Sequence, residues 1–186
     1  MKEGRGRNHR PDETAVVLAA HGIPAADFPR FRVGLFVMLE FAGRAVERLG
    51  VLRAWRDSLD RKIRTWPRTP ANDHYKAAVE GLAAKLSARL GRRVVVAYNE
   101  FCDPGLGEAI DGLIDAGIRR LVVVPTMLVR GNSHTEIEIR ESVLQAARRH
   151  PAADIGYAWP FEDEGVVSLL KGQVENRLGP DSRPTA

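Results

Sequence analysis

The chain has 186 residues, of which 44% are hydrophobic and 28% are charged. This composition is that of one ordinary globular domain, and it excludes collagen-like, coiled-coil and intrinsically disordered chains. The formal net charge of +4 favours anionic ligands, but no element typical of nucleic-acid binding is present. The single cysteine, Cys102, excludes an internal disulfide framework and suits a reducing compartment. Because we also find no apolar leader and no membrane-spanning run, we expect a cytoplasmic protein that binds neither nucleic acid nor a membrane.

The first predicted element is a buried strand at 15–20, a continuous apolar run that ends at His21 and Gly22. The polar residues 1–14 predict a disordered basic tail, and residues 180–186 predict a second tail. We therefore expect one domain over residues 15–179. Within it, segment 28–71 runs from an apolar cluster into an arginine-rich stretch, and it predicts a helical insertion after the first strand.

Strands and helices alternate in the rest of the chain. Continuous apolar runs at 94–98, 121–125 and 155–159 predict strands that are covered on both faces. Apolar periods of three and four predict helices at 82–90, 106–114 and 167–178. For the second of these helices we expect Asp103 as N-cap, Pro104 as first helical residue and Gly117 as the stop. The alternation predicts an α/β fold, a parallel four-stranded sheet sandwiched by helices.

Two histidines follow predicted strands of this sheet. In the common strand order 2-1-3-4, the first and third strands are neighbours, and ligands bind beyond their carboxyl ends. His21 follows the first strand, and His134 lies after the third. The sequence Ser133-His134-Thr135-Glu136 matches a capping box, which predicts that His134 begins a helix. Both rings should therefore face one crevice.

Two glutamates belong to the same predicted edge. Glu138 lies four residues after His134, so both side chains share one helical face. Glu100 closes the second strand. The phosphate-binding loops of nucleotide-binding folds and the nucleophile elbow of α/β hydrolases are absent from the sequence. Two imidazoles and one or two carboxylates are ligands that suit a divalent first-row metal.

These residues carry a resemblance to a known family. The first strand ends in His-Gly, the second ends in Asn-Glu-Phe-Cys-Asp-Pro, and the third continues as Val-Val-Val-Pro-Thr-Met-Leu-Val-Arg-Gly-Asn-Ser-His-Thr-Glu-Ile-Glu-Ile. This pattern resembles the class II tetrapyrrole chelatases, and in particular the short, single-domain form of sirohydrochlorin cobaltochelatase. The likeness covers roughly 15–21 and 93–178.

The resemblance implies a flavodoxin-like chelatase fold, a homodimer, and a lyase of tetrapyrrole and cobalamin biosynthesis. It implies that His21 and His134 bind the incoming metal, and that Glu100 and Glu138 take the positions of the family's acidic residues. The implied substrates are a sirohydrochlorin-type tetrapyrrole and a divalent ion, Co²⁺ first and Ni²⁺ or Fe²⁺ as alternatives. No organic cofactor is expected.

Two other functions stay open from the sequence. One is a metal- or tetrapyrrole-binding protein without catalysis, and the other is a metal-assisted hydrolase. The arginines of the insertion also allow two interpretations, because they could pair with substrate carboxylates or form a solvated helix face. These are Arg53, Arg56, Arg61 and Arg64.

Overall fold

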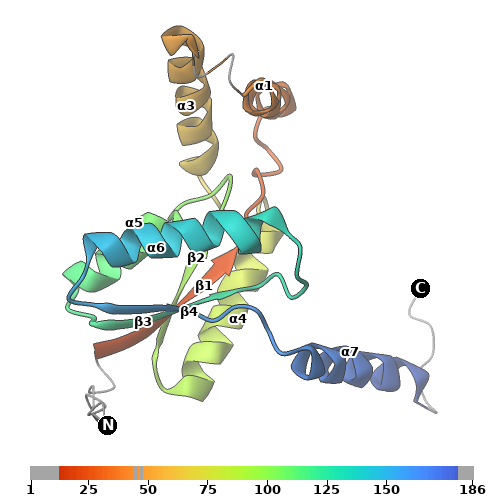
Figure 1. Ribbon diagram of the computed structural model, residues 1–186. Helices are drawn as coiled ribbons and strands as arrows, with labels where there is room; N and C mark the ends of the chain where they lie inside the picture. Colours follow the sequence, from red (N-terminus) through yellow and green to blue (C-terminus); the bar gives the residue numbers. More distant parts are fainter. Residues whose placement is uncertain (1–12, 44–45, 47, 180–186) are drawn as a thin grey trace.

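The computed structural model describes residues 13–43, 46 and 48–179 (Figure 1). Four strands in this part of the chain form one parallel sheet in the order β2-β1-β3-β4. They are β1 (Thr14–Ala20), β2 (Arg93–Tyr98), β3 (Arg120–Pro125) and β4 (Asp154–Tyr157). The predicted strand order is confirmed. Of the two predicted tails, residues 1–12 and 180–186 lie outside the described residues, and Thr14 already belongs to β1.

The central strand β1 distributes its side chains between two cores. Ala15, Val17 and Ala19 are buried on one face, against α5 (Leu106–Asp115) and α6 (Ile139–Arg149). Leu18 and Ala20 are buried on the other face, against α4 (His74–Leu90). Because side chains alternate along a strand, a strand covered on both faces must be apolar throughout. Burial of both faces of the sheet therefore explains the continuous apolar runs of the sequence.

The helical insertion stands beyond the carboxyl ends of the strands (Figure 1). It contains α1 (Arg30–Phe41) and α3 (Gly50–Arg64), which pack on each other around a core of their own. Phe36 and Leu39 of α1 and Leu59 and Ile63 of α3 are buried there. The insertion therefore lies at the edge of the sheet where ligands bind in this class of fold.

The start of α5 differs from the prediction. The helix begins at Leu106 with Gly105 as N-cap, so neither Asp103 nor Pro104 caps it or opens it. The reason is a continuation of the β2 pairing: the Tyr98 amide donates to the Pro104 carbonyl at 2.9 Å, which holds this stretch extended. The predicted stop is confirmed, because Gly117 follows the helix with φ +90°.

The last helix, α7 (Asp163–Leu178), extends away from the sheet, and none of its residues is buried (Figure 1). Its apolar residues at helical spacing, Val167, Leu170, Val174 and Leu178, are between 55% and 78% exposed. The predicted helix is present, but its apolar side does not pack on the sheet of its own chain. Among the described helices, none is both long and apolar enough to cross a membrane.

Candidate metal site

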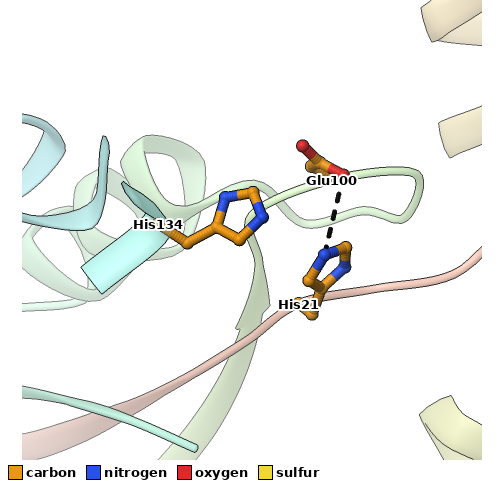
Figure 2. A group of neighbouring side chains, drawn as sticks. All are labelled: His21, Glu100 and His134. Carbon is orange, nitrogen blue, oxygen red and sulfur yellow. Dashed lines mark ion pairs between the residues drawn. The ribbon is translucent and has the colours of Figure 1, made fainter. Parts of the chain in front are cut away.

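Three potential metal ligands meet at the carboxyl edge of the sheet (Figure 2). His21 directly follows β1, and Glu100 lies two residues beyond β2. His134 opens η2 (His134–Glu138), a five-residue π-helix that leads into α6. Since β1 lies between β2 and β3, the strand order alone brings the three segments to one place.

The spacing of the three side chains suits one cation. One ligand atom from each of His21, Glu100 and His134 lies within 4.8 Å of the others. His21 Nε2 is 3.9 Å from Glu100 Oε2. Two ligands bonded to one metal at about 2.1 Å lie about 3.4 Å apart across a tetrahedron. A small closing movement of the side chains would therefore allow all three to bind the same ion.

A backbone contact fixes the tautomer of His21. Its Nδ1 lies 2.7 Å from the Gly22 carbonyl oxygen, and a carbonyl can only accept, so Nδ1 carries the proton. Nε2 then keeps its lone pair and faces Glu100. Metal-bound imidazoles commonly hold their second nitrogen in this way.

His134 is held by two polar side chains. Its Nδ1 lies 3.0 Å from Glu138 Oε2 and 2.8 Å from Asn99 Nδ2, and the Asn99 amide also donates to Glu138 Oε2 at 2.7 Å. When Nδ1 carries the proton and donates it to Glu138, the Asn99 amide donates to Glu138 and not to the ring, and Nε2 presents a lone pair to a metal. The structure thus brings His134 and Glu138 together as the spacing predicted, with Glu138 beside the ligand cluster.

Glu138 is held in its ionised form. Partial burial raises the pKa of Glu138, but the hydrogen bonds with Asn99 and His134 outweigh it, and the net pKa lies below the ordinary value. A positive charge on His134 or His21 would lower the pKa of Glu138 further. A carboxylate here therefore stabilises positive charge on the two rings.

The loops after β1 and β2 touch through their backbones. The Glu100 amide donates to the His21 carbonyl at 2.8 Å. Gly22 has φ +90°, and a Cβ at this position would lie 1.9 Å from the Glu100 carbonyl oxygen, so only glycine fits. Phe101 has φ 58°, rare for a residue with a side chain, and the Cys102 amide bonds back to the Glu100 carbonyl at 2.7 Å. Such a strained turn persists where the surroundings fix it.

The predicted capping box at His134 is wrong, because Ser133 makes no side-chain cap. Asn132 replaces it: its Oδ1 accepts from the His134 amide at 2.8 Å. Glu136 Oε1 instead accepts a hydrogen bond from the Gly131 amide at 3.2 Å. The Tyr157 hydroxyl of β4 donates to the Thr135 carbonyl at 2.9 Å, which ties the turn at His134 to the sheet.

Arg64 of the insertion faces the protein. Its guanidinium donates to the carbonyls of Asn99 and Cys102 and pairs with Asp60. It borders a cavity of about 240 Å³ between the insertion and the metal-ligand loops, lined by Phe36, Glu40, Asp60, Arg64, Asn99, Glu100, Phe101 and Glu138. Arg56 pairs with Glu40 and Asp57. These two arginines therefore have partners within the chain, and they do not form a simple solvated helix face.

Sequence reasoning missed several polar residues that hold the site. Tyr75 of α4 accepts a hydrogen bond from the His21 amide at 3.2 Å, and the Asn99 amide donates to Glu138 Oε2 at 2.7 Å beside His134. The signal for Asn99 was its position directly after the second strand, beside Glu100. Tyr75 gave no signal, because its role depends on the packing of α4.

Comparison with known proteins identifies the family. The CbiX family model matches residues 71–177, more than half of the chain. The chain belongs to the CbiX family. It is 26% identical over 80 residues to a sirohydrochlorin ferrochelatase of Priestia megaterium, which covers 42% of this chain and 30% of that protein.

SirB from Bacillus subtilis shares the fold of this CbiX family member. SirB from Bacillus subtilis with Fe³⁺ superposes with a TM-score of 0.50 at 16% identity, over 90% of this chain and 48% of that chain. A CbiX protein from Marinobacter aquaeolei VT8 gives a TM-score of 0.49 at 15% identity, over 88% of this chain and 98% of that chain. The chain thus spans less than half the length of the ferrochelatase and of SirB.

Proposed function

We propose that this protein is a chelatase that inserts a divalent metal ion into a sirohydrochlorin-type tetrapyrrole. The observation that carries the proposal is the meeting of His21, Glu100 and His134 at the carboxyl edge of the sheet, with ligand atoms within 4.8 Å of one another. Two imidazoles and one carboxylate bind a first-row divalent ion and leave positions free for water or for a second ligand. A substrate metal needs such an open site because it must leave again.

The reaction exchanges two pyrrole N–H protons for the metal ion. His21 and His134, as neutral imidazoles with Glu100, replace water on the ion and hold it over one face of the macrocycle. As the metal forms bonds to the ring nitrogens, its bonds to the protein break. An imidazole released in this way accepts a pyrrole proton. The metal then remains in the ring, and both protons pass through the site to water.

Glu138 supports this exchange through its charge. Its lowered pKa makes it a poor final acceptor for a proton at neutral pH. Its carboxylate lies 3.0 Å from His134 Nδ1 and stabilises the imidazolium that forms when His134 takes a proton. Glu138 therefore supports the proton transfer to His134 without binding the metal itself.

We propose Co²⁺ as the first metal to test and Fe²⁺ as the second. The sequence resemblance favours cobalt, whereas the relative from Priestia megaterium carries the name of a ferrochelatase. Histidine and carboxylate ligands accept both ions, and the donor set does not separate them.

We propose that the active form is a homodimer. The cavity beside the ligands, at about 240 Å³, is smaller than the roughly 300–1,000 Å³ of typical small-molecule pockets. A tetrapyrrole therefore needs further surface around the exposed side of His21 and Glu100. A second copy of the chain can supply it, and α7 offers an apolar surface for association.

The test of the activity is an insertion assay. Purified protein is mixed with sirohydrochlorin and Co²⁺ or Fe²⁺, and the change in the tetrapyrrole absorption spectrum is followed over the uncatalysed rate. We expect acceleration with wild-type protein and none with His21→Ala. If wild-type protein binds the metal but does not accelerate insertion, it is a binding protein and the chelatase proposal fails.

A further inference from the structure

We propose that Arg68, between α3 and α4, is a positioning residue that sets the distance between the loops carrying His21 and Glu100. The inference rests on the proposed function of these loops as a metal site. Arg68 belongs to the arginine-rich stretch of the insertion, and the sequence predicted no individual role for it. Its side chain is only 7% exposed, so it contacts protein and not solvent.

The guanidinium of Arg68 joins four acceptors from separate segments. Nη1 donates to the Ile23 carbonyl at 2.7 Å and to Asp73 Oδ2 at 2.6 Å. Nη2 donates to the Phe101 carbonyl at 2.5 Å and to the Ile63 carbonyl at 3.0 Å. One planar group thereby connects the loop after β1, the loop after β2 and the last turn of α3.

The two loop contacts are close to the proposed ligands. Ile23 is two residues beyond His21, and Phe101 directly follows Glu100. On the ligand side, the same two loops are joined by the hydrogen bond from the Glu100 amide to the His21 carbonyl. Arg68 provides the second connection, and two connections fix an orientation that one leaves free to rotate.

Arg68 is itself held in place by Asp73. The carboxylate of Asp73 is 1% exposed, and its other oxygen accepts from the Lys76 amide at 2.8 Å as the N-cap of α4. Nη1 and Nη2 have all their partners in protein, whereas Nε is buried without a hydrogen-bond partner among the described residues. The four bonds that are made hold this buried charge pair in one geometry. The position of the guanidinium therefore depends on α4, which packs on β2 in the sheet.

Only arginine can make these contacts together. Its planar fork presents five N–H donors in fixed directions, whereas lysine has one nitrogen on a flexible stem. Lysine at position 68 would keep the ion pair with Asp73 but could not bond both loop carbonyls in the same geometry. Glutamine would lose the charge as well and leave Asp73 buried without its partner.

Three variants test the inference: Arg68→Gln, Arg68→Lys, and Arg89→Gln as a control that removes a charge from the exposed surface of α4. Co²⁺ is titrated into each, and its visible absorption bands report the ligands and their geometry. Loss of a group that orients metal ligands weakens metal binding by about 10–100-fold, and we expect this range for Arg68→Gln. We expect a smaller loss with altered Co²⁺ bands for Arg68→Lys, and wild-type behaviour for Arg89→Gln.

A second measurement separates positioning from a general loss of stability. Hydrogen exchange of the Glu100 amide reports the contact between the two loops, and exchange of the Val17 amide in β1 reports the core. We expect both Arg68 variants to accelerate exchange at Glu100 more than at Val17. If Arg68→Gln does not fold, Arg68→Lys alone decides by the same two readouts.

Wild-type Co²⁺ affinity, spectrum and Glu100 exchange in a folded Arg68 variant would overturn the inference. Failure of the wild-type protein to bind Co²⁺ would instead overturn the proposed function. In that case, the exchange rate at Glu100 still shows whether Arg68 positions the loops, so the two failures are distinguishable.

Discussion

His21 and His134 meet edge to face, with ring centroids 4.7 Å apart and ring planes at 83° to each other. They follow two strands that are neighbours in the sheet but far apart in the sequence. Each ring has one nitrogen close to a fixed partner: the Gly22 carbonyl for His21, and Glu138 with Asn99 for His134. The remaining nitrogens are the ones that we propose as metal ligands.

Replacing either histidine should weaken metal binding while the fold survives. We expect His21→Ala and His134→Ala to bind Co²⁺ at least about tenfold more weakly, because each removes one of three proposed ligands. Both rings are partly exposed, at 39% for His21 and 17% for His134, so thermal unfolding should change little. Isothermal titration calorimetry with Co²⁺ measures the affinity of each variant. His150→Ala is the control, since His150 pairs with Asp111 on α5, and its affinity should match the wild type.

Gly22→Ala should disrupt the site through the backbone. The added Cβ would lie 1.9 Å from the Glu100 carbonyl oxygen, at a residue with φ +90°, so the loop after β2 must move. Gly91→Ala is the matched control: Gly91 has φ +61° but open space around it, and its strain alone costs about 1–2 kcal/mol. Urea unfolding should show the larger loss for Gly22→Ala, with Co²⁺ binding lost in that variant only. Equal losses of stability in both variants would contradict the close approach.

Asn99→Ala should raise the pKa of Glu138 toward its ordinary value, because it removes a hydrogen-bond donor to the carboxylate. A carboxyl group with a lowered pKa stabilises the fold above its ordinary pKa, and this contribution disappears as pH falls through the lowered value. The variant should therefore lose a small part of this stabilisation. Carbon-13 NMR of the Glu138 carboxyl group across acidic pH measures the shift. The carboxyl of Asp111, which bonds Arg149 and His150, is the internal control.

Tyr157 should make the protein sensitive to alkaline pH. Burial, with a smaller contribution from the charge of Glu136, raises the pKa of its phenol to about 12, against about 10 in an unfolded chain. The neutral phenol donates to the Thr135 carbonyl. Its contribution to stability is complete below pH 10 and is lost as pH rises from about 10 toward 12. Tyr157→Phe should lower stability at neutral pH by about 1–3 kcal/mol and flatten this alkaline dependence in urea unfolding. An unchanged alkaline profile would exclude Tyr157 as its source.

The proposed homodimer is testable through α7. We expect light scattering to give twice the chain mass of 20.6 kDa for the wild type. Leu170→Glu together with Val174→Glu places charges on the exposed apolar side of α7 and should shift the protein to monomer. Lys171→Glu is the control on the same helix, because it changes charge without removing apolar surface. A monomeric wild type would contradict the proposal.

The sequence was sufficient for the sheet and for the position of the proposed ligands. Continuous apolar runs identify strands such as β1 and β3, and the strand order then determines that His21, Glu100 and His134 share an edge. The details of the loops were not accessible. Asp103 is a residue type common at N-caps, but the backbone hydrogen bond between Tyr98 and Pro104 delays the start of the helix. In the same way, Asn132 and not Ser133 accepts the hydrogen bond from the His134 amide. Long-range polar contacts such as those of Arg68 leave no local pattern in a sequence.

The most direct test of a shared metal site is the anomalous diffraction of a crystal grown with Co²⁺. We predict one strong peak at the carboxyl edge of the sheet, within bonding distance of His21 Nε2, a ring nitrogen of His134 and a carboxylate oxygen of Glu100. A Co²⁺ peak elsewhere, or one bound by a single member of this group, would contradict the account.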